Sequence, residues 1–421
     1  MIPSASDRRD RIGAWLKRAR GESMAVAAAR LLSSGSALVV AAISARQLGP
    51  GGRGEIVFVV TVAMLCSEFV SLGANVSGRI HILRRSDVLI EDYLGLITVL
   101  VALQALLVTL ILMTVGPTRF GLDPASCLLG VVLGVAMFFA HMMVDAAFAV
   151  RRTLETGIRD MLIGVLPMFL VVLVAVRGQL SVSLVIGLTA MGYVVGGFYL
   201  WRVVRRTADR IRFVPSRWSL VLRSGIPVLA GSFGQTVALR ADRLLVGLLS
   251  TSAALGVYSM AATAAELPRI LLIPVTQILA NRVAMGDITV RSLSSIFRRL
   301  ALAYGALMVG VAVVGAAIIV PIVGPGFEDV RDSIAVLALS EGLLGLFLVS
   351  ASVLTGFGQF RRLPLPSLCG AAVIVVADII VVPRFGGSGA AWVLVAGFGS
   401  MALVAGALAL ACVRSTADGS S

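Results

Sequence analysis

Twelve apolar runs, each long enough to cross a lipid bilayer, follow one another along the chain with short polar connectors between them. They cover approximately residues 24–48, 55–79, 93–115, 124–150, 157–176, 180–204, 219–249, 253–284, 296–323, 331–356, 366–384 and 389–413. About 20 apolar residues suffice for one membrane-spanning helix. No run alternates polar and apolar residues as a membrane barrel strand does. We therefore predict an all-α integral membrane protein with about 12 transmembrane helices.

Composition leaves little room for a soluble catalytic domain. Hydrophobic residues make up 58% of the 421 residues and charged residues 14%, against roughly 25% charged in an ordinary globular domain. The sequence contains no C-x-x-C pair and no G-x-x-x-x-G-K-[ST] motif, which are signatures of thiolate metal sites and of nucleotide sites. We expect no cofactor and no metal site. We also expect no nucleic-acid partner, despite a net charge of +14.

The basic residues are concentrated in alternate connectors. With the N-terminus inside, the inner segments hold 26 Lys and Arg residues, the outer connectors hold six, and four lie within spans. Arg53 belongs to the outer set in this count, and Arg159 belongs to the inner set. Lys and Arg are enriched in cytoplasmic loops. We therefore expect a multi-pass protein of the cytoplasmic (inner) membrane with both termini cytoplasmic.

The longest inner connector divides the spans into two groups of six. We predict a basic cytoplasmic tail at 1–23, an N-terminal six-helix bundle at 24–204, a cytoplasmic linker at 205–218, a C-terminal six-helix bundle at 219–413 and a cytoplasmic tail at 414–421. For the first tail, a short surface helix and disorder both remain open. Local similarity aligns Gly54 with Gly256 and Gly35 with Gly225. This similarity suits two bundles related by a pseudo-two-fold axis, as in many transporters.

Three stretches carry a resemblance to a known family. They are Arg46-Gln47-Leu48-Gly49-Pro50 with Gly54-Glu55, then Arg240-Ala241-Asp242-Arg243 through Leu255-Gly256-Val257-Tyr258-Ser259 to Pro268 and Pro274, and finally Gly324-Pro325-Gly326-Phe327-Glu328 with Pro383 to Ala391. In order and spacing the chain resembles the oligosaccharide flippases of bacterial polysaccharide synthesis, whose superfamily also holds multidrug and toxin extrusion antiporters and lipid II flippases. The resemblance implies two six-helix bundles around a central cavity, alternating access, and a polyprenyl-diphosphate-linked oligosaccharide as cargo.

Arginines within the spans mark a candidate substrate site, because a charge inside a membrane costs about 2.5–3.5 kcal/mol on insertion scales. Arg240 and Arg243 lie three residues apart in the seventh span, and Glu266 and Arg269 repeat that spacing in the eighth. Guanidinium groups match phosphate oxygens, so the arginines predict a cavity wall that binds a diphosphate. The alternative is an internal salt-bridge set, with Asp242 and Glu266, that fixes helix packing.

Arg30 in the first span is a fourth candidate for the substrate site. It either faces the same cavity or reaches the inner surface as a snorkelling side chain. Lipid II flippases line their cavity with arginines from the first, second and eighth helices. Arg30 and Arg269 match that pattern in helix number, but the second span offers Glu68 in place of an arginine. This departure puts lipid II itself in doubt as the substrate.

Acidic and histidine side chains within the spans are candidates for ion coupling. His141 and Asp145 lie one helical turn apart and are close enough to share a proton, while Glu341 and Asp378 are acids in the middle of later spans. A proton or sodium site at one of these residues is one interpretation, and charge balance is another. The candidate coupling or charge-balancing residues are Glu68, His141, Asp145, Asp242, Glu266, Glu341 and Asp378.

We predict a transporter, and not an enzyme, that flips a lipid-linked oligosaccharide for cell-surface polysaccharide synthesis. Membrane lipids and the glycosyltransferases or polymerase of the same pathway are the expected partners. A multidrug antiporter of the same fold is an alternative, although an excess of arginine disfavours cationic drugs. A membrane-embedded glycan polymerase or acyltransferase is an alternative from another class, but such enzymes usually carry a large polar loop, and every outer connector here is short.

Overall fold

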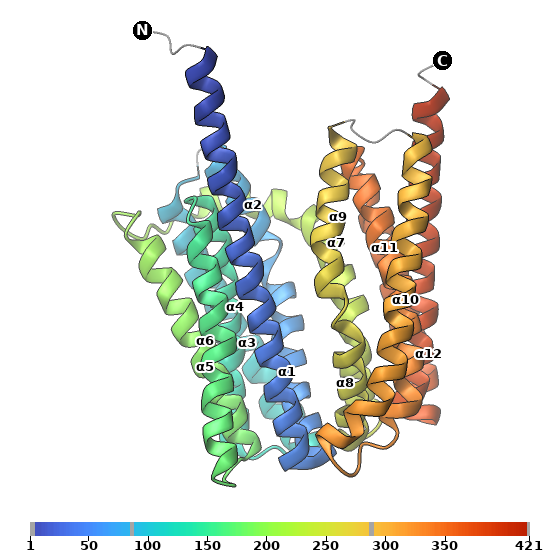
Figure 1. Cartoon of the computed structure of the whole chain (residues 1–421). Coiled ribbons are helices and arrows are strands. Elements are labelled where there is room, and N and C mark those ends of the chain that lie inside the picture. Colours follow the sequence, from blue (N-terminus) through green and yellow to red (C-terminus); the bar gives the residue numbers. More distant parts are fainter. Residues whose placement is uncertain (1–4, 85–87, 286–289, 419–421) are drawn as a thin grey trace.

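The computed structural model describes residues 5–84, 88–285 and 290–418, and nearly all of these residues are helical, with no strand among them (Figure 1). The helices are α1 Ala5–Ser71, α2 Ala74–Leu83, α3 Ile90–Val115, α4 Pro124–Ala149, α5 Thr153–Val176, α6 Val182–Arg205, α7 Pro215–Leu249, α8 Ser252–Glu266, α9 Arg269–Ala284, α10 Val290–Val323, α11 Val330–Gly356 and α12 Pro364–Asp418. A π-helical turn, Gly116–Phe120, follows α3, and a 3-10 turn, Phe360–Arg362, precedes α12.

Two of the helices reverse direction at a glycine. α1 folds back at Gly49 (φ 68°) and α12 at Gly386 (φ 56°), a conformation that glycine adopts without steric cost. In the described part of the chain, eight helices, including α1 and α12, are long and apolar enough to cross a membrane, and the bent pair α8–α9 is a ninth. α1 and α12 each contain two spans, so the eight helices make ten crossings, and the pair α8–α9 makes an eleventh. The more polar α7 is long enough to make a twelfth. The predicted fold class is confirmed.

The spans gather into two groups, α1–α6 and α7–α12 (Figure 1). The start of α1 and the end of α12 lie at the same, upper end of the view, as an even number of crossings requires. α1 begins at Ala5, so the backbone of the predicted basic tail continues the first span as a helix. The second span is interrupted at Leu72 and Gly73, which both have positive φ and separate α1 from α2.

The two groups meet closely at the lower end of Figure 1. There Gly54 of α1 packs against the backbone carbonyl of Ser252, and Gly256 of α8 packs against the backbone carbonyl of Pro50. A methyl group at either glycine would overlap the facing oxygen. The absence of a side chain at these two positions is therefore what lets the helices touch through their backbones.

The first turns of α7 pack against the first group of helices. The Arg217 guanidinium donates to the Asp92 carboxylate (Nη1 to Oδ2, 2.6 Å), and the Trp218 indole N–H donates to the backbone oxygen of Asp92 at 2.9 Å. Pro227, which removes a backbone hydrogen bond inside a helix, follows ten residues after Arg217 in the same helix. The segment before it is therefore anchored to α3.

Candidate functional site

Four arginines and a glutamate line a cavity of about 380 Å³ between the two groups of helices. Arg53 comes from the second half of α1, Arg240 and Arg243 come from α7, and Arg269 comes from the start of α9. We call these four residues the arginine cluster. The first half of α1 forms another wall, through Ser34, Ala37, Leu38 and Ala41. Both halves of the protein therefore contribute to the cavity.

A helix break places two of the charged residues. Pro268 lies between the end of α8 at Glu266 and the start of α9 at Arg269, and the two helix axes differ by 42°. Proline cannot donate the backbone hydrogen bond that would continue the helix. On the facing helix α7, Arg240 and Arg243 are three residues apart and so lie on one face.

Glu266 is the shared partner of three arginines. Its Oε1 lies 3.3 Å from Nη1 of Arg240 and 2.5 Å from Nη2 of Arg243. Its Oε2 lies 3.3 Å from Nη2 of Arg269. Arg269 also contacts α11, where its Nη1 lies 3.2 Å from Oε1 of Glu341. The structure thus brings together three of the four arginines that the sequence singled out. It also forms the part of the alternative salt-bridge set that centres on Glu266, whereas Asp242 bonds to Tyr258 instead.

The arginine cluster contains hydrogen-bond donors without an acceptor, which an anion could use. The Nε atoms of Arg53 and Arg243 are buried and have no acceptor among the described residues. Four guanidinium groups face the two carboxylates of Glu266 and Glu341. This wall is therefore positively charged when all six groups are ionised, and guanidinium forks bind phosphate oxygens well.

Two arginines are placed differently from the sequence-based count. Arg53 was assigned to an outer connector, but α1 resumes directly after the reversal at Gly49, so Arg53 lies inside the helix and lines the cavity. Arg159 was assigned to an inner connector, but it is only 7% exposed within α5. Because the chain reverses at Gly49 alone, no loop separates the two spans of α1, and Arg53 falls within the second of them. The alignment of Gly54 with Gly256, a residue of the eighth span, was the signal that could have revealed this.

Arg30 is not among the residues that line the cavity. Its Nε lies 3.2 Å from Oδ2 of Asp160 in α5, and Arg159 Nη1 lies 2.6 Å from Oδ1 of the same carboxylate. The Arg159 guanidinium also lies over the Tyr193 ring, 6.0 Å from its centroid. Arg30 nevertheless sits one helical turn from Ser34, which does line the cavity. The structure thus separates Arg30 from the arginine cluster.

The proposed proton-sharing pair in the fourth span is not formed. His141 Nδ1 lies 2.8 Å from the backbone oxygen of Met137, and Asp145 pairs with Arg79 (Oδ1 to Nη1, 3.1 Å). Each side chain therefore has a partner other than the one that their spacing suggested. Glu68 is half-buried in the second half of α1.

Two carboxylates are buried within the second group of helices. Asp242 accepts a hydrogen bond from the Tyr258 hydroxyl at 2.5 Å, and its Oδ1 has no partner in the described part of the chain. Asp378 of α12 is fully buried, and neither of its oxygens has a partner among the described residues. A buried carboxylate without partners is costly as an anion. Tyr258, which sequence reasoning did not select, also lines a cavity of about 560 Å³.

The sequence of the chain matches one protein family. A family model described as "Polysaccharide biosynthesis protein" matches residues 22–279, more than half of the chain. By sequence, the chain matches no curated protein.

Solved structures share the fold at low sequence identity. An inward-facing multidrug resistance MATE family transporter of the MOP superfamily has a TM-score of 0.74 at 15% identity, with 94% of this chain and 100% of that chain covered. The lipid II flippase MurJ in an inward closed conformation has a TM-score of 0.71 at 11% identity, with 91% and 86% covered. An outward-facing MATE family transporter has a TM-score of 0.61 at 11% identity, with 94% and 96% covered.

Proposed function

Because the chain belongs to the polysaccharide biosynthesis protein family, we propose that it flips a polyprenyl-diphosphate-linked oligosaccharide from the inner to the outer leaflet of the cytoplasmic membrane. The product would supply cell-surface polysaccharide synthesis, and the protein would work by alternating access. The arginine cluster is the observation that carries this proposal. It presents four guanidinium groups to a cavity between the two groups of helices, where the diphosphate would lie.

Glu266 is a counter-anion within the arginine cluster. It pairs with Arg240, Arg243 and Arg269 at once, so a single carboxylate offsets part of the buried positive charge before substrate binds. An incoming diphosphate offers more negative charge and more acceptor oxygens than one carboxylate, and can therefore take over these arginines. Binding is thus an exchange of anions. Arg53, which has no ion pair in the described structure, is free to join from the opposite side of the cavity.

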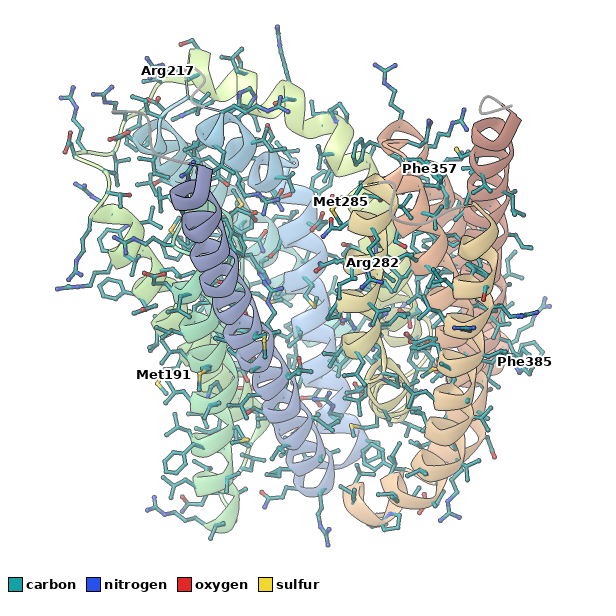
Figure 2. All side chains as sticks on the ribbon, turned by 45° about the horizontal axis from the view of Figure 1, so that its top comes forward. Met191, Arg217, Arg282, Met285, Phe357 and Phe385 are labelled. Carbon is teal, nitrogen blue, oxygen red and sulfur yellow. The ribbon has the colours of Figure 1, made fainter. Side chains whose placement is uncertain are left out.

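The polyprenyl tail would remain in the bilayer, and the structure offers one side for it. At Gly73 and Gly225 the first group and α7 touch through their backbones. At Gly35, which the sequence aligns with Gly225, no atom of the described residues outside the backbone of α1 lies within 4 Å of the position that a Cβ would take. The contact between Gly73 and Gly225 therefore has no equivalent at Gly35. Residues of α1 and of α9 line the cavity here, and we propose that the polyprenyl tail leaves between these two helices. Figure 2 shows the exposed Arg282 and Met285 at the upper end of α9, toward the first group.

The same asymmetry suits alternating access. The lower end is closed by the contacts of Gly54 and Gly256, and the two groups lie farther apart at the upper end (Figure 1). With the orientation that the basic residues predict, the upper end is cytoplasmic and the cavity would load from that side. Asp378, beside Asp242 and Tyr258, is our proposed coupling residue, since protonation or a bound cation would relieve its unpaired charge.

Reconstitution into liposomes tests the proposal. A fluorescent oligosaccharide on undecaprenyl diphosphate is placed in the membrane, and its arrival in the other leaflet is followed with an impermeant quencher. We expect transport by the unaltered protein, at least about tenfold slower transport by Arg243→Gln, from the loss of one charge-assisted contact, and normal transport by Arg119→Gln, whose residue lies in the turn after α3. No transport by well-folded protein would reject the proposal. Transport of cationic drugs instead would indicate an antiporter, and glycan polymerisation would indicate an enzyme.

A further inference from the structure

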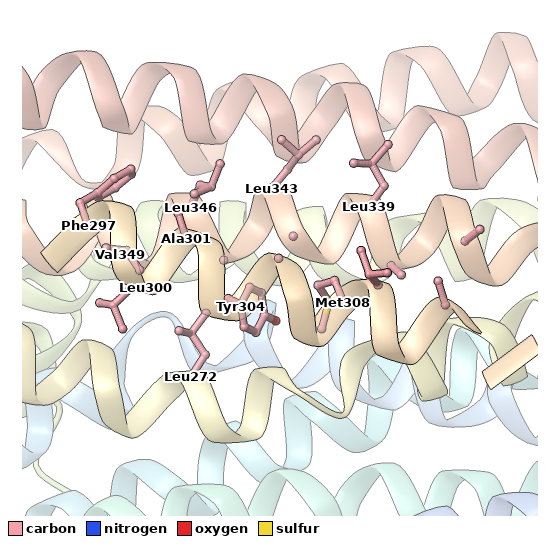
Figure 3. Close-up of a pocket in the computed structure, with 17 residues that line it drawn as sticks. Leu272, Phe297, Leu300, Ala301, Tyr304, Met308, Leu339, Leu343, Leu346 and Val349 are labelled. Atoms are coloured by element: carbon pink, nitrogen blue, oxygen red, sulfur yellow. The ribbon is translucent and has the colours of Figure 1, made fainter. Parts of the chain in front are cut away.

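A second cavity, of about 460 Å³, runs between α10 and α11 and does not include the arginine cluster (Figure 3). Its walls are apolar, and small residues contribute to both of them. Ala301 and Gly305 come from α10, and Ala338 and Gly342 come from α11. Apart from the backbone of α10 itself, no atom of the described residues lies within 4 Å of the position that a Cβ at Gly305 would take. The small residues thus leave a groove between two helices that would otherwise pack together.

The groove is accessible from the lipid. Val309 of α10 is 64% exposed and Leu339 of α11 is 50% exposed, and both line the groove. Only 11% of the apolar stretch of α10 is buried in the protein, against 56% for α11. The groove therefore faces the hydrocarbon region of the bilayer, and an occupant must be soluble there.

The groove adjoins the charged network of the substrate site. Leu272 of α9 lines it, one helical turn after Arg269. On α11, Gly345 packs against both Leu272 and the ring of Tyr304, and it lies one turn after Glu341, the partner of Arg269. The same two helices, α9 and α11, thus carry the charged network and, one turn further along the same face, the wall of the groove.

We propose that this groove binds the polyprenyl chain of the transported lipid, an inference that rests on the proposed function. A chain leaving the cavity past α9 meets the groove at Leu272. From Phe297 to Ala312, the groove follows α10 for about 22 Å at 1.5 Å per residue, which is most of the thickness of a bilayer core. A polyprenyl chain is covalently attached to the diphosphate that we place at the arginine cluster, and Leu272 lies one turn of α9 after Arg269 of that cluster. A bilayer phospholipid has no such attachment to the cavity.

Filling the groove should slow transport of a substrate with a long polyprenyl chain and leave transport of a short-chain substrate unchanged. Gly305→Trp places a large side chain in the groove, and Gly310→Trp, which lies on the same helix but does not line the groove, is the matched control. The same oligosaccharide is offered on undecaprenyl diphosphate and on farnesyl diphosphate. We expect Gly305→Trp to slow transport of the long-chain substrate at least about tenfold, as when roughly two methylene groups leave an apolar site. Transport of the short-chain substrate should be unchanged, and Gly310→Trp should affect neither. Equal loss for both substrates, or no loss for either, would overturn the proposal.

Photo-crosslinking separates this inference from the proposed function. A diazirine-bearing undecaprenyl phosphate should label α10 in the unaltered protein and in Gly310→Trp but not in Gly305→Trp. Labelling by a diazirine phospholipid that excess undecaprenyl phosphate does not reduce would show a bilayer lipid in the groove and reject the proposal. Labelling by the polyprenyl probe in a protein that transports no glycan would reject the proposed function and support the groove.

Discussion

Gly54 and Gly256 make the same contact from opposite sides of the interface between the two halves. Gly54 packs on the carbonyl of Ser252, four residues before Gly256, and Gly256 packs on the carbonyl of Pro50, four residues before Gly54. The weak alignment of the two halves pairs these same positions. Each half therefore uses the same surface, as in a two-fold interface between identical subunits.

This contact should act as the outer gate. Gly256→Leu would force the backbones apart, because no space exists for a side chain there. We expect a cysteine at Ala37, on the cavity wall, to react with an impermeant maleimide from outside the cell in this variant and only from inside in its absence. Gly310→Leu, on a lipid-facing position, is the control. An Ala37→Cys site that stays unreactive from outside would show that these glycines do not close the cavity.

Orientation in the membrane can be tested by labelling. Ser216→Cys, at the upper end of α7, should react only from the cytoplasmic side, because the basic residues around it favour that side. Arg177→Cys, directly after α5, should react only from outside. Labelling of Ser216→Cys in intact cells would reverse the topology and, with it, the direction of transport that we propose.

Arg53 should contribute to diphosphate binding without a structural role. It has no ion pair in the described chain, so Arg53→Gln breaks none, and the affinity for undecaprenyl diphosphate should fall roughly ten- to hundredfold, the equivalent of about 1.5–3 kcal/mol. Arg53→Lys should restore only part of this, since lysine lacks the planar fork. Arg46→Gln, which removes a hydrogen bond to the backbone oxygen of Ile322 outside the cavity, is the control. Equal affinities for Arg53→Gln and Arg46→Gln in a binding titration would exclude Arg53 from the site.

Replacing Asp378 should abolish ion coupling without lowering thermal stability. Both of its oxygens are buried without partners among the described residues, so Asp378→Asn removes no interaction, and thermal stability should hold or rise. Transport by this variant should no longer respond to a proton or sodium gradient. Asp160→Asn makes the contrast, because Asp160 pairs with Arg30 and Arg159, and breaking a buried pair costs about 3–5 kcal/mol. Gradient-dependent transport by Asp378→Asn would contradict the coupling role.

The fold class could be predicted because the length of each apolar run and the distribution of Arg between connectors can be read directly along the chain. The seventh and eighth spans even revealed three arginines of the site, since charges three residues apart share a helical face. Pro268 lies between Glu266 and Arg269, and proline favours a helix break at that position. These features need no knowledge of how the helices pack.

The pairing of side chains on different helices could not be predicted from the sequence in this way. His141 and Asp145 satisfy the spacing for a shared proton, yet tertiary packing gives Asp145 to Arg79 on α2. Arg53 was missed because Gly-Pro-Gly-Gly normally indicates a loop, whereas here Gly49 alone makes the reversal. The choice of Glu266 as common partner depends on the bend between α8 and α9, and no pattern along the chain specifies it.

The central claim is that the arginine cluster exchanges Glu266 for a diphosphate, and a double-mutant cycle on transport tests it most directly. Transport of the undecaprenyl-diphosphate glycan and affinity for undecaprenyl diphosphate are measured for Arg269→Gln, for Glu266→Gln and for the two changes together, with membrane protein levels matched. The account predicts that Glu266→Gln binds the diphosphate more tightly, because a competing carboxylate is gone, and that the double variant remains as inactive as Arg269→Gln. Recovery of transport in the double variant would contradict the account, because Arg269 would then serve only to neutralise Glu266.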